Sequence, residues 1–311
     1  MTISEIRKAI VAVQDLAAAR RFYASTFDYI SHGEVDVAGA GYESLWNMPA
    51  GLAGKTALLG PAGATTGLLQ LVQFDRAGQR IWGDYQHPEN YGHYALNVRV
   101  PRIQPAIDKI LAHGGRAKSN PTHWTVSAEV SAWDSLSYDP DGVILDVFEL
   151  ELAPGSLLAD YDGRCSPLQT VALHVSDARR SARFYAALGY RPWYDKLLEN
   201  MEQFFNMPKG TSLHNINMVQ PGAPLGRIEI AQYVGWPGRS QRDRAVPPNT
   251  GILSIAMETD DLDATMQLLA SIGTEPCSAA AVVVRAPLSG NVRARSYYGP
   301  DDELLEFYQR I

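Results

Sequence analysis

The chain repeats itself once along its length, and this duplication constrains the fold more than any other feature. "AVQDLAAARRFYASTFDY" (12–29) recurs as "LHVSDARRSARFYAALGY" (173–190), and "GLLQLVQF" (67–74) recurs as "GRIEIAQY" (226–233). Near the end of each copy, "YDPDGVILDVF" (138–148) is matched by "YGPDDELLEFY" (298–308). The offset stays close to ~160 residues, which is too long for a solenoid repeat and indicates a duplicated domain. We therefore predict two domains, 1–150 and 168–311, joined by the Pro- and Gly-containing stretch 151–167.

Each copy also divides into two smaller units with the order strand, helix and three strands. In the first unit, Asp15 or Asp177 is expected to cap a helix that buries the Phe-Tyr pair. In the second unit, a strand at 93–100 or 253–260 leads into a helix that ends near Gly114 or Gly273. The expected fold class is therefore α+β, with four βαβββ units.

Composition narrows the classes of partner. The formal net charge is -7 and the pI is about 5.5, which argues against a nucleic-acid groove and an anionic membrane surface. No apolar stretch approaches the ~20 residues that span a bilayer. Cys165 and Cys277 lack motif spacing and are expected to be unpaired thiols in a reducing cytoplasm. We expect a cytoplasmic protein whose partner is a small-molecule substrate; a homodimer is left open.

The pattern resembles the vicinal oxygen chelate superfamily, which includes glyoxalase I, extradiol dioxygenases, methylmalonyl-CoA epimerase and bleomycin-resistance proteins. The resemblance rests on "D-x(6)-FY" in both copies and on "HYALNV", "SIAMETDDLD", "DPDGVILD" and "GPDDELLEF", which together extend over nearly the whole chain. It implies that paired units form half-open, eight-stranded barrels, two in tandem, each able to hold one divalent metal. Because one fold supports many reactions, the resemblance does not fix the chemistry.

In that family the first and last strands of each unit supply metal ligands. The corresponding positions in the second copy are His174, Glu229, Ser254 and Glu306. Glu229 and Glu306 each lie between apolar residues of a strand, where a carboxylate is costly to bury without a partner. The resemblance therefore predicts a metal held by His174, Glu229 and Glu306, with an open position for substrate or water. Nitrogen and oxygen ligands leave Zn, Ni, Co, Mn and Fe as candidates.

The first copy is expected to have a degenerate site. Its corresponding positions are Ala12, Gln70, His93 and Asp146, and neither alanine nor a neutral amide is an effective ligand. The strand that begins at His93 also has two more residues before its helix than its counterpart, and a shift of two residues would put Ala95 at the ligand position. An expected division of labour follows, in which one copy keeps the chemistry and the other keeps the fold.

The family resemblance offers several reactions. A metal-dependent isomerase, epimerase or lyase would stabilise an enolate, with Glu306 or Glu229 as the base. An extradiol dioxygenase is the first alternative, although Ser254 replaces the second histidine of a two-His-one-carboxylate site. A metal-free binding or drug-resistance protein is the second. The supply of aromatic residues favours an apolar or aromatic carbonyl-containing ligand. The residues expected to bind it are Ser254, Phe205, Trp236, Tyr298 and Arg295.

Overall fold

The computed structural model describes residues 1–82, 90–127, 130–152, 163–205 and 207–311. Part of the predicted linker, 153–162, lies outside the described residues. The described segments form four βαβββ units, as predicted. The first unit comprises β1 (Ile3–Ala12), α1 (Leu16–Phe27), β2 (Ile30–Val37), α2 (Gly39–Leu45), β3 (Gly54–Gly60) and β4 (Leu68–Phe74). The second comprises β5 (Gly92–Arg99), α3 (Ile103–Ala112), β6 (Arg116–Ala117), β7 (Thr122–Ser127), β8 (Val130–Tyr138) and β9 (Ile144–Leu152).

The second copy repeats this order. Its first unit comprises β10 (Leu168–His174), α4 (Ala178–Ala187), β11 (Arg191–Leu198), α5 (Glu202–Phe205), β12 (Ser212–Val219) and β13 (Arg227–Val234). Its second comprises β14 (Gly251–Thr259), α6 (Leu262–Ser271), β15 (Val282–Ala286), β16 (Gly290–Tyr298) and β17 (Leu304–Arg310). The predicted caps are confirmed, because Asp15 and Asp177 accept from Ala18 N and Arg180 N, both at 2.9 Å.

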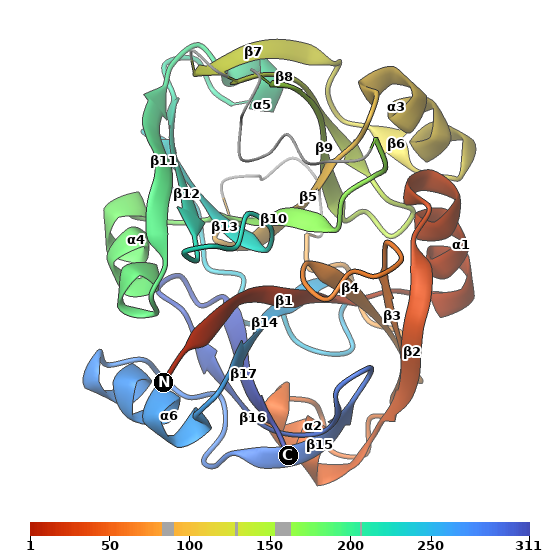
Figure 1. Cartoon of the computed structure of the whole chain (residues 1–311), viewed down its shortest axis with the longest axis vertical. Coiled ribbons are helices and arrows are strands. Elements are labelled where there is room, and N and C mark those ends of the chain that lie inside the picture. Colours follow the sequence, from red (N-terminus) through yellow and green to blue (C-terminus); the bar gives the residue numbers. More distant parts are fainter. Residues whose placement is uncertain (83–89, 128–129, 153–162, 206) are drawn as a thin grey trace.

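The four units pair in an order that the sequence did not predict. One sheet runs β15-β16-β17-β14-β1-β4-β3-β2, and joins the first unit of the chain to the last. The other runs β11-β12-β13-β10-β5-β9-β8-β6, with β7 beside β8, and joins the two middle units. We call these the terminal barrel (residues 3–74 and 251–310) and the central barrel (residues 92–152 and 168–234). Figure 1 shows the terminal barrel in red and blue, with the central barrel in yellow, green and cyan beside it.

The expectation that 1–150 and 168–311 each close a barrel is therefore corrected. Each barrel takes one unit from each copy, joined by the antiparallel pairs β1–β14 and β10–β5. All four units have the same strand pattern, so local sequence does not distinguish pairing within a copy from pairing between copies. This pairing of units between the copies determines which side chains lie together inside each barrel.

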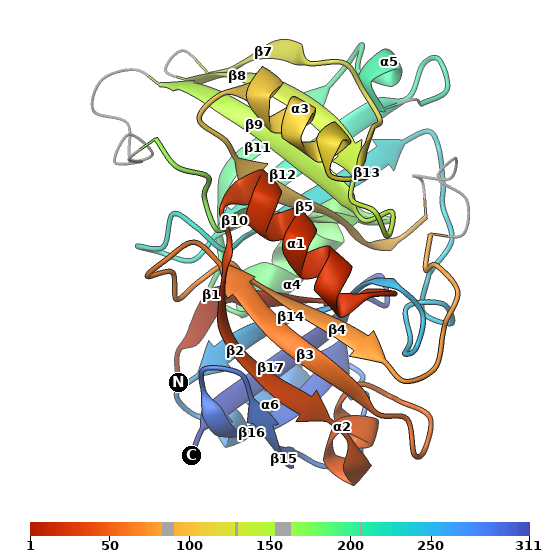
Figure 2. The same ribbon diagram turned by 90° about the vertical axis from the view of Figure 1, so that its right-hand side faces the viewer.

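Helices cover the outer faces of the sheets. Their buried side chains belong to a hydrophobic cluster that also includes residues from both sheets. Figure 2 shows α1 of the terminal barrel beside α3 of the central barrel. The Phe-Tyr pair of each copy lies at such a junction. Tyr23 of α1 donates to Asp139 Oδ2 (2.9 Å), just after β8, and Tyr185 of α4 donates to Glu303 Oε1 (2.7 Å), just before β17. Both tyrosines are buried, so the repeated motif links the two barrels.

Candidate functional site

A cavity of about 350 Å³ lies inside the central barrel and opens to solvent. Its walls are largely aromatic, and its floor carries carboxyl and amide groups from the strands. No lysine or arginine lines it among the described residues. This combination of apolar walls and a few polar groups is typical of a small-molecule site. The lining residues used below are Tyr94, Ala95, Trp124, Asp134, Asp146, His174, Tyr194, Phe204, Phe205, Asn215, Asn217 and Glu229.

Two of the carboxyl groups form a pair. Asp134 on β8 lies opposite Phe148, and Asp146 on β9 lies opposite Leu136, so the two aspartates are diagonal neighbours on one face. A hydrogen bond joins their side chains. Burial raises the pKa of Asp134 to about 6, and burial together with the charge of Asp134 raises the pKa of Asp146 well above its usual range. The pair therefore holds a proton at higher pH than an ordinary carboxyl group does, and the charge of Asp134 favours keeping that proton on Asp146.

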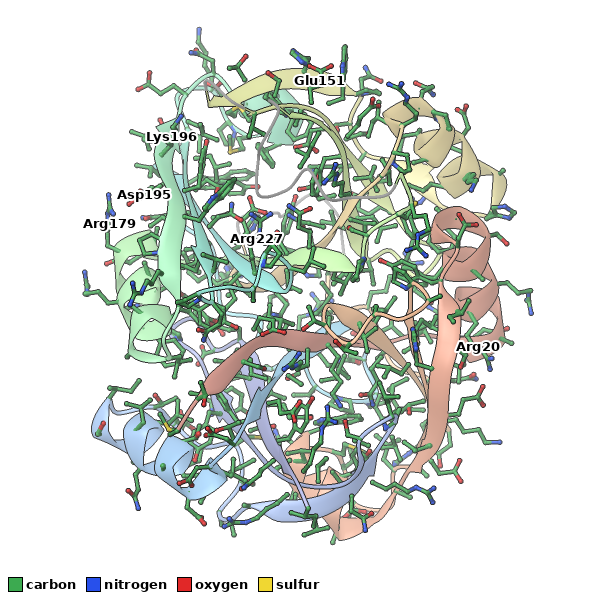
Figure 3. The ribbon with its side chains drawn as sticks, in the orientation of Figure 1. Arg20, Glu151, Arg179, Asp195, Lys196 and Arg227 are labelled. Atoms are coloured by element: carbon green, nitrogen blue, oxygen red, sulfur yellow. The ribbon has the colours of Figure 1, made fainter. Side chains whose placement is uncertain are left out.

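Glu229 on β13 is held in a different way. Asn97 Nδ2 donates to Glu229 Oε2 at 2.5 Å, and Asn215 Nδ2 donates to Glu229 Oε1. Burial raises the pKa of Glu229, and the two amides and the nearby Arg227 offset this only in part. Figure 3 shows Arg227 beside the strands of the central barrel, whereas Arg179 and Asp195 lie on the outside of α4 and β11. The amide donors stabilise the ionised form of Glu229, in contrast to the aspartate pair.

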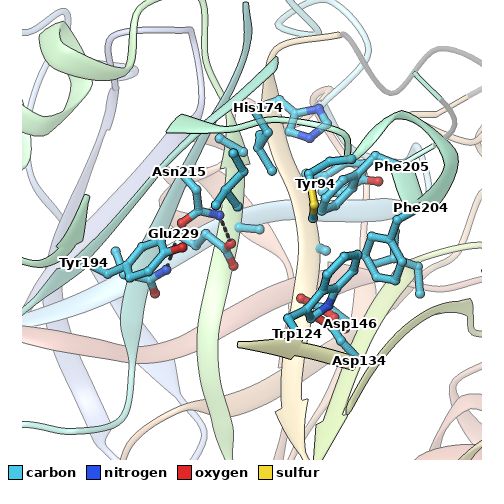
Figure 4. Close-up of a pocket in the computed structure, with 18 of the residues that line it drawn as sticks. Tyr94, Trp124, Asp134, Asp146, His174, Tyr194, Phe204, Phe205, Asn215 and Glu229 are labelled. Carbon is cyan, nitrogen blue, oxygen red and sulfur yellow. Dashed lines mark hydrogen bonds between the residues drawn. The ribbon is translucent and has the colours of Figure 1, made fainter. Parts of the chain in front are cut away.

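Figure 4 shows Glu229 with Asn215 on one side of the cavity, and Asp134 and Asp146 beside Trp124 on another. The groups are close enough for the charge of Glu229 to raise the pKa of both aspartates. The cavity thus contains carboxyl groups in two kinds of surroundings, a hydrogen-bonded aspartate pair and a glutamate that accepts from two amides.

Aromatic rings form the remaining wall. His174 stacks on Tyr94 with ring centroids 3.8 Å apart, and Tyr233 meets the same imidazole at 4.5 Å. Trp124 packs edge-to-face against Phe204 at 4.8 Å. Burial raises the pKa of Tyr94, which therefore keeps its phenolic proton at neutral pH.

An irregularity in β5 decides which side chains enter the cavity. Ala95 pairs with Ala172 while His93 pairs with Leu173, so Tyr94 is an extra residue at a bulge. Ala95 lines the cavity, as the sequence comparison allowed, and His93 does not. His93 Nε2 lies 3.0 Å from the Leu304 carbonyl of the terminal barrel, and burial lowers the pKa of His93 to about 4. The neutral imidazole therefore joins the two barrels.

The terminal barrel is filled where the central barrel is hollow. Trp46 and other apolar side chains occupy its interior. Lys8 Nζ lies 3.6 Å from Glu306 Oε1, and Trp46 Nε1 donates to Glu306 Oε2 at 2.8 Å. Glu306 on β17 lies opposite Ala256 on β14. Asp146 on β9 lies opposite Asn97 on β5 in the same way, so Glu306 and Asp146 occupy corresponding positions in the two barrels. Lysine and indole donors thus satisfy Glu306 inside a packed core.

The proposed metal ligands are consequently divided. His174 and Glu229 line the cavity of the central barrel, but Glu306 lies in the other sheet and pairs with Lys8. The expected convergence of His174, Glu229 and Glu306 is corrected, because the barrels exchange units between the copies. The expectation that the site belongs to 168–311 alone is corrected for the same reason, since residues 94–146 supply much of the cavity.

The predicted substrate contacts are divided too. Phe205 lines the cavity. Ser254 is buried and donates to the Leu304 carbonyl, and Arg295 donates to the Ser278 and Ala279 carbonyls. Tyr298 stacks under the Arg242 guanidinium at 3.7 Å. Trp236 stacks on Tyr233 at 5.8 Å without being a lining residue.

The positions expected in the first copy are likewise separated. Asp146 lines the cavity of the central barrel, whereas Ala12 and Gln70 are buried in the terminal barrel. Sequence reasoning missed Asp134, Asn97 and Asn215. The available signal was a polar residue at an inward position of a strand with apolar neighbours, as in "LHNINMV" and "HYALNVRV".

The arrangement does not fit the metal that the resemblance implies. The described residues contain no group of three or more His, Cys, Asp or Glu side chains placed to hold a metal ion. Amide N–H groups occupy both oxygens of Glu229, and Asp146 is hydrogen bonded to Asp134. Glu306 already has Lys8 as its cation. The predicted metal site is therefore not formed by these side chains.

Among the described helices, none combines the length and the apolar character needed to cross a bilayer. Sequence comparison finds no matching family model and no matching curated protein.

Comparison of the fold with solved structures does find relatives. Glyoxalase I from Zea mays aligns with a TM-score of 0.64 at 15% identity, covering 98% of this chain and 92% of that one. A proposed dioxygenase from Bacillus subtilis aligns with a TM-score of 0.61 at 12% identity, covering 99% of this chain and 86% of that one. At these identities the likeness concerns the fold. The chain has the two-barrel fold of the vicinal oxygen chelate superfamily.

Proposed function

We propose that this protein is an enzyme that moves a proton to and from carbon in an apolar, aromatic carbonyl compound, as an isomerase, epimerase or lyase does. The observation that supports this is the pair of contrasting carboxyl environments in one aromatic cavity. Groups whose surroundings push their pKa values apart are the usual acid and base of a proton-transfer site. Perturbed carboxyl groups also concentrate at functional sites.

In this proposal Glu229 is the base. Its carboxylate, oriented by Asn97 and Asn215, accepts the proton when the C–H bond next to the substrate carbonyl breaks. The bonding electron pair moves onto the carbonyl oxygen, where the phenol of Tyr94 is available to donate a hydrogen bond. Asp146, protonated through its contact with Asp134, returns a proton to the carbon from the aspartate side. Exchange with solvent then restores both carboxyl groups.

Deuterium exchange tests the proposal without knowledge of the natural substrate. Aryl ketones, aryl keto acids and aryl amino ketones are incubated with the full chain in deuterium oxide, and loss of the proton next to the carbonyl is followed by NMR. Protein-dependent exchange is expected for at least one compound, and Glu229→Gln should abolish it. Glu199→Gln, at an exposed acid that does not line the cavity, is the matched control. Compounds that bind in the cavity without exchanging would contradict the enzymatic role and support the binding-protein alternative.

A further inference from the structure

Three oxygen atoms at the cavity floor have no hydrogen-bond donor among the described residues. Asn97 Oδ1, Asp134 Oδ1 and Asp146 Oδ1 are buried atoms without a hydrogen-bond partner in the described part of the chain. Asn97 is 3% exposed, and it shares the face of β5 on which Ala95 lines the cavity. All three atoms are oxygens that can accept a hydrogen bond, so the group that would complete them is a donor.

On the aspartate side of the floor, the described residues also provide no counterion. Of the three carboxyl groups, Glu229 has a nearby cation, Arg227, whose guanidinium lies 4.9 Å above the Trp193 ring. In the part of the chain that the structure describes, no lysine or arginine lines the cavity beside Asp134 and Asp146. A carboxylate in such a place is costly to bury unless a positive group joins it. The aspartate side of the cavity therefore favours a cation and disfavours an anion.

The neighbouring rings suit an organic cation better than a bare ion. Asp134 is hydrogen bonded to Trp124, and Trp124 packs on Phe204. Aromatic faces attract ammonium groups and cover the apolar body attached to them. A protonated amine supplies the positive charge, the N–H donors and the apolar body together.

Resting on the proposed function, we infer that the substrate carries a protonated amine next to the reacting carbon, and that Asp134 binds this ammonium group between Trp124 and the cavity floor. Asp134 is the specificity-determining residue in this inference. The substrate class is then an aryl-bearing amino carbonyl compound, and Glu229 faces the carbon from the side that Asn215 occupies.

Isothermal titration calorimetry on the full chain tests this with three probes of one shape: naphthylmethylammonium, naphthylmethanol and naphthoate. The ammonium ion is expected to bind at least about tenfold more tightly than the alcohol, and naphthoate most weakly, because hydrogen bonds to charged groups outweigh neutral ones. Trimethyl(naphthylmethyl)ammonium, which has no N–H, should lose part of that gain. Equal or tighter binding of the alcohol or naphthoate would overturn the inference.

Asp134→Asn should bring the affinity for the ammonium ion close to that for the alcohol, while Asp263→Asn, at an exposed acid paired with Arg293, leaves the preference intact. Unchanged affinity for the alcohol shows that the Asp134 variant is folded. Titration with MnCl₂ or ZnCl₂ alone is a further arm. Metal binding that depends on Asp134 and displaces the ammonium ion would overturn the inference. Ammonium preference without deuterium exchange refutes the proposed function alone, and exchange confined to neutral or anionic ketones refutes this inference alone.

Discussion

Lys8 Nζ lies 3.6 Å from Glu306 Oε1 in the interior of the terminal barrel, where both side chains are almost inaccessible to solvent. The corresponding position of the central barrel carries Asp146, whose neighbour is a second acid, Asp134. One scaffold position thus holds a neutralised charge in one barrel and a proton-sharing pair in the other. We infer that the polar centre of the terminal barrel serves stability and that of the central barrel serves chemistry.

Lys8→Met should destabilise the protein by about 3–5 kcal/mol, because it leaves Glu306 as an unpaired buried charge. Lys8→Met combined with Glu306→Leu should recover much of the loss, since neither charge then remains. Urea denaturation followed by circular dichroism gives both free energies of unfolding. A single variant as stable as the parent would show that Glu306 does not depend on Lys8.

Tyr185→Phe should cost about 1–3 kcal/mol by leaving one oxygen of buried Glu303 without its donor. Tyr23→Phe should have a similar effect at Asp139. The two pairs share no residue, so the double variant should lose approximately the sum. Losses well below ~0.5 kcal/mol for each variant would contradict the role given to the repeated Phe-Tyr motif in joining the barrels.

The same acids predict a pH dependence of stability. Burial raises the pKa of Asp139 and of Glu303 to about 7, from ordinary values of 3.8 and 4.5. The folded state therefore binds these protons more tightly than the unfolded chain does. Their contribution is complete below about pH 4 and is lost as the pH rises through about 7. The free energy of unfolding should be larger at pH 5 than at pH 8, and Glu303→Gln should flatten the difference. The opposite slope, unchanged in Glu303→Gln, would exclude this account.

Asn215→Ala removes a donor from Glu229 and should raise the pKa of Glu229, since a hydrogen bond to a charged group contributes about 1.5–3 kcal/mol. The acid limb of the exchange rate against pH should move to higher pH. Asn120→Ala, at an exposed amide that does not line the cavity, is the matched control. Equal shifts in the two variants would mean that the amide at 215 does not tune the base.

The fold was accessible from the sequence because duplication, helix caps and turn motifs are local signals. Asp15 and Asp177 cap their helices as predicted, and four βαβββ units follow in order. Which units pair was not accessible. β1 pairs with β14 rather than with β5, and that choice depends on long-range packing that identical strand patterns do not encode.

The site was accessible only in part for the same reason. His174, Glu229 and Phe205 are inward residues of units that remain together, so they line one cavity. Glu306 was assigned to that cavity because it lies in the same copy of the repeat. Its unit pairs with the first unit of the chain, so Glu306 lies in the terminal barrel instead. The bulge at Tyr94 turned His93 away and brought Ala95 in, and such a one-residue irregularity leaves no clear mark in the sequence.

Carbon-13 NMR of side-chain carboxyl groups tests the central claim most directly, with Asp134→Asn, Asp146→Asn and Glu229→Gln assigning the three signals. The account predicts that Asp134 titrates near pH 6 and that the pKa of Asp146 lies well above the ordinary range of an aspartate. Titration of all three groups below pH 5 would contradict it, because the cavity would then contain three ordinary carboxylates and no acid to return a proton.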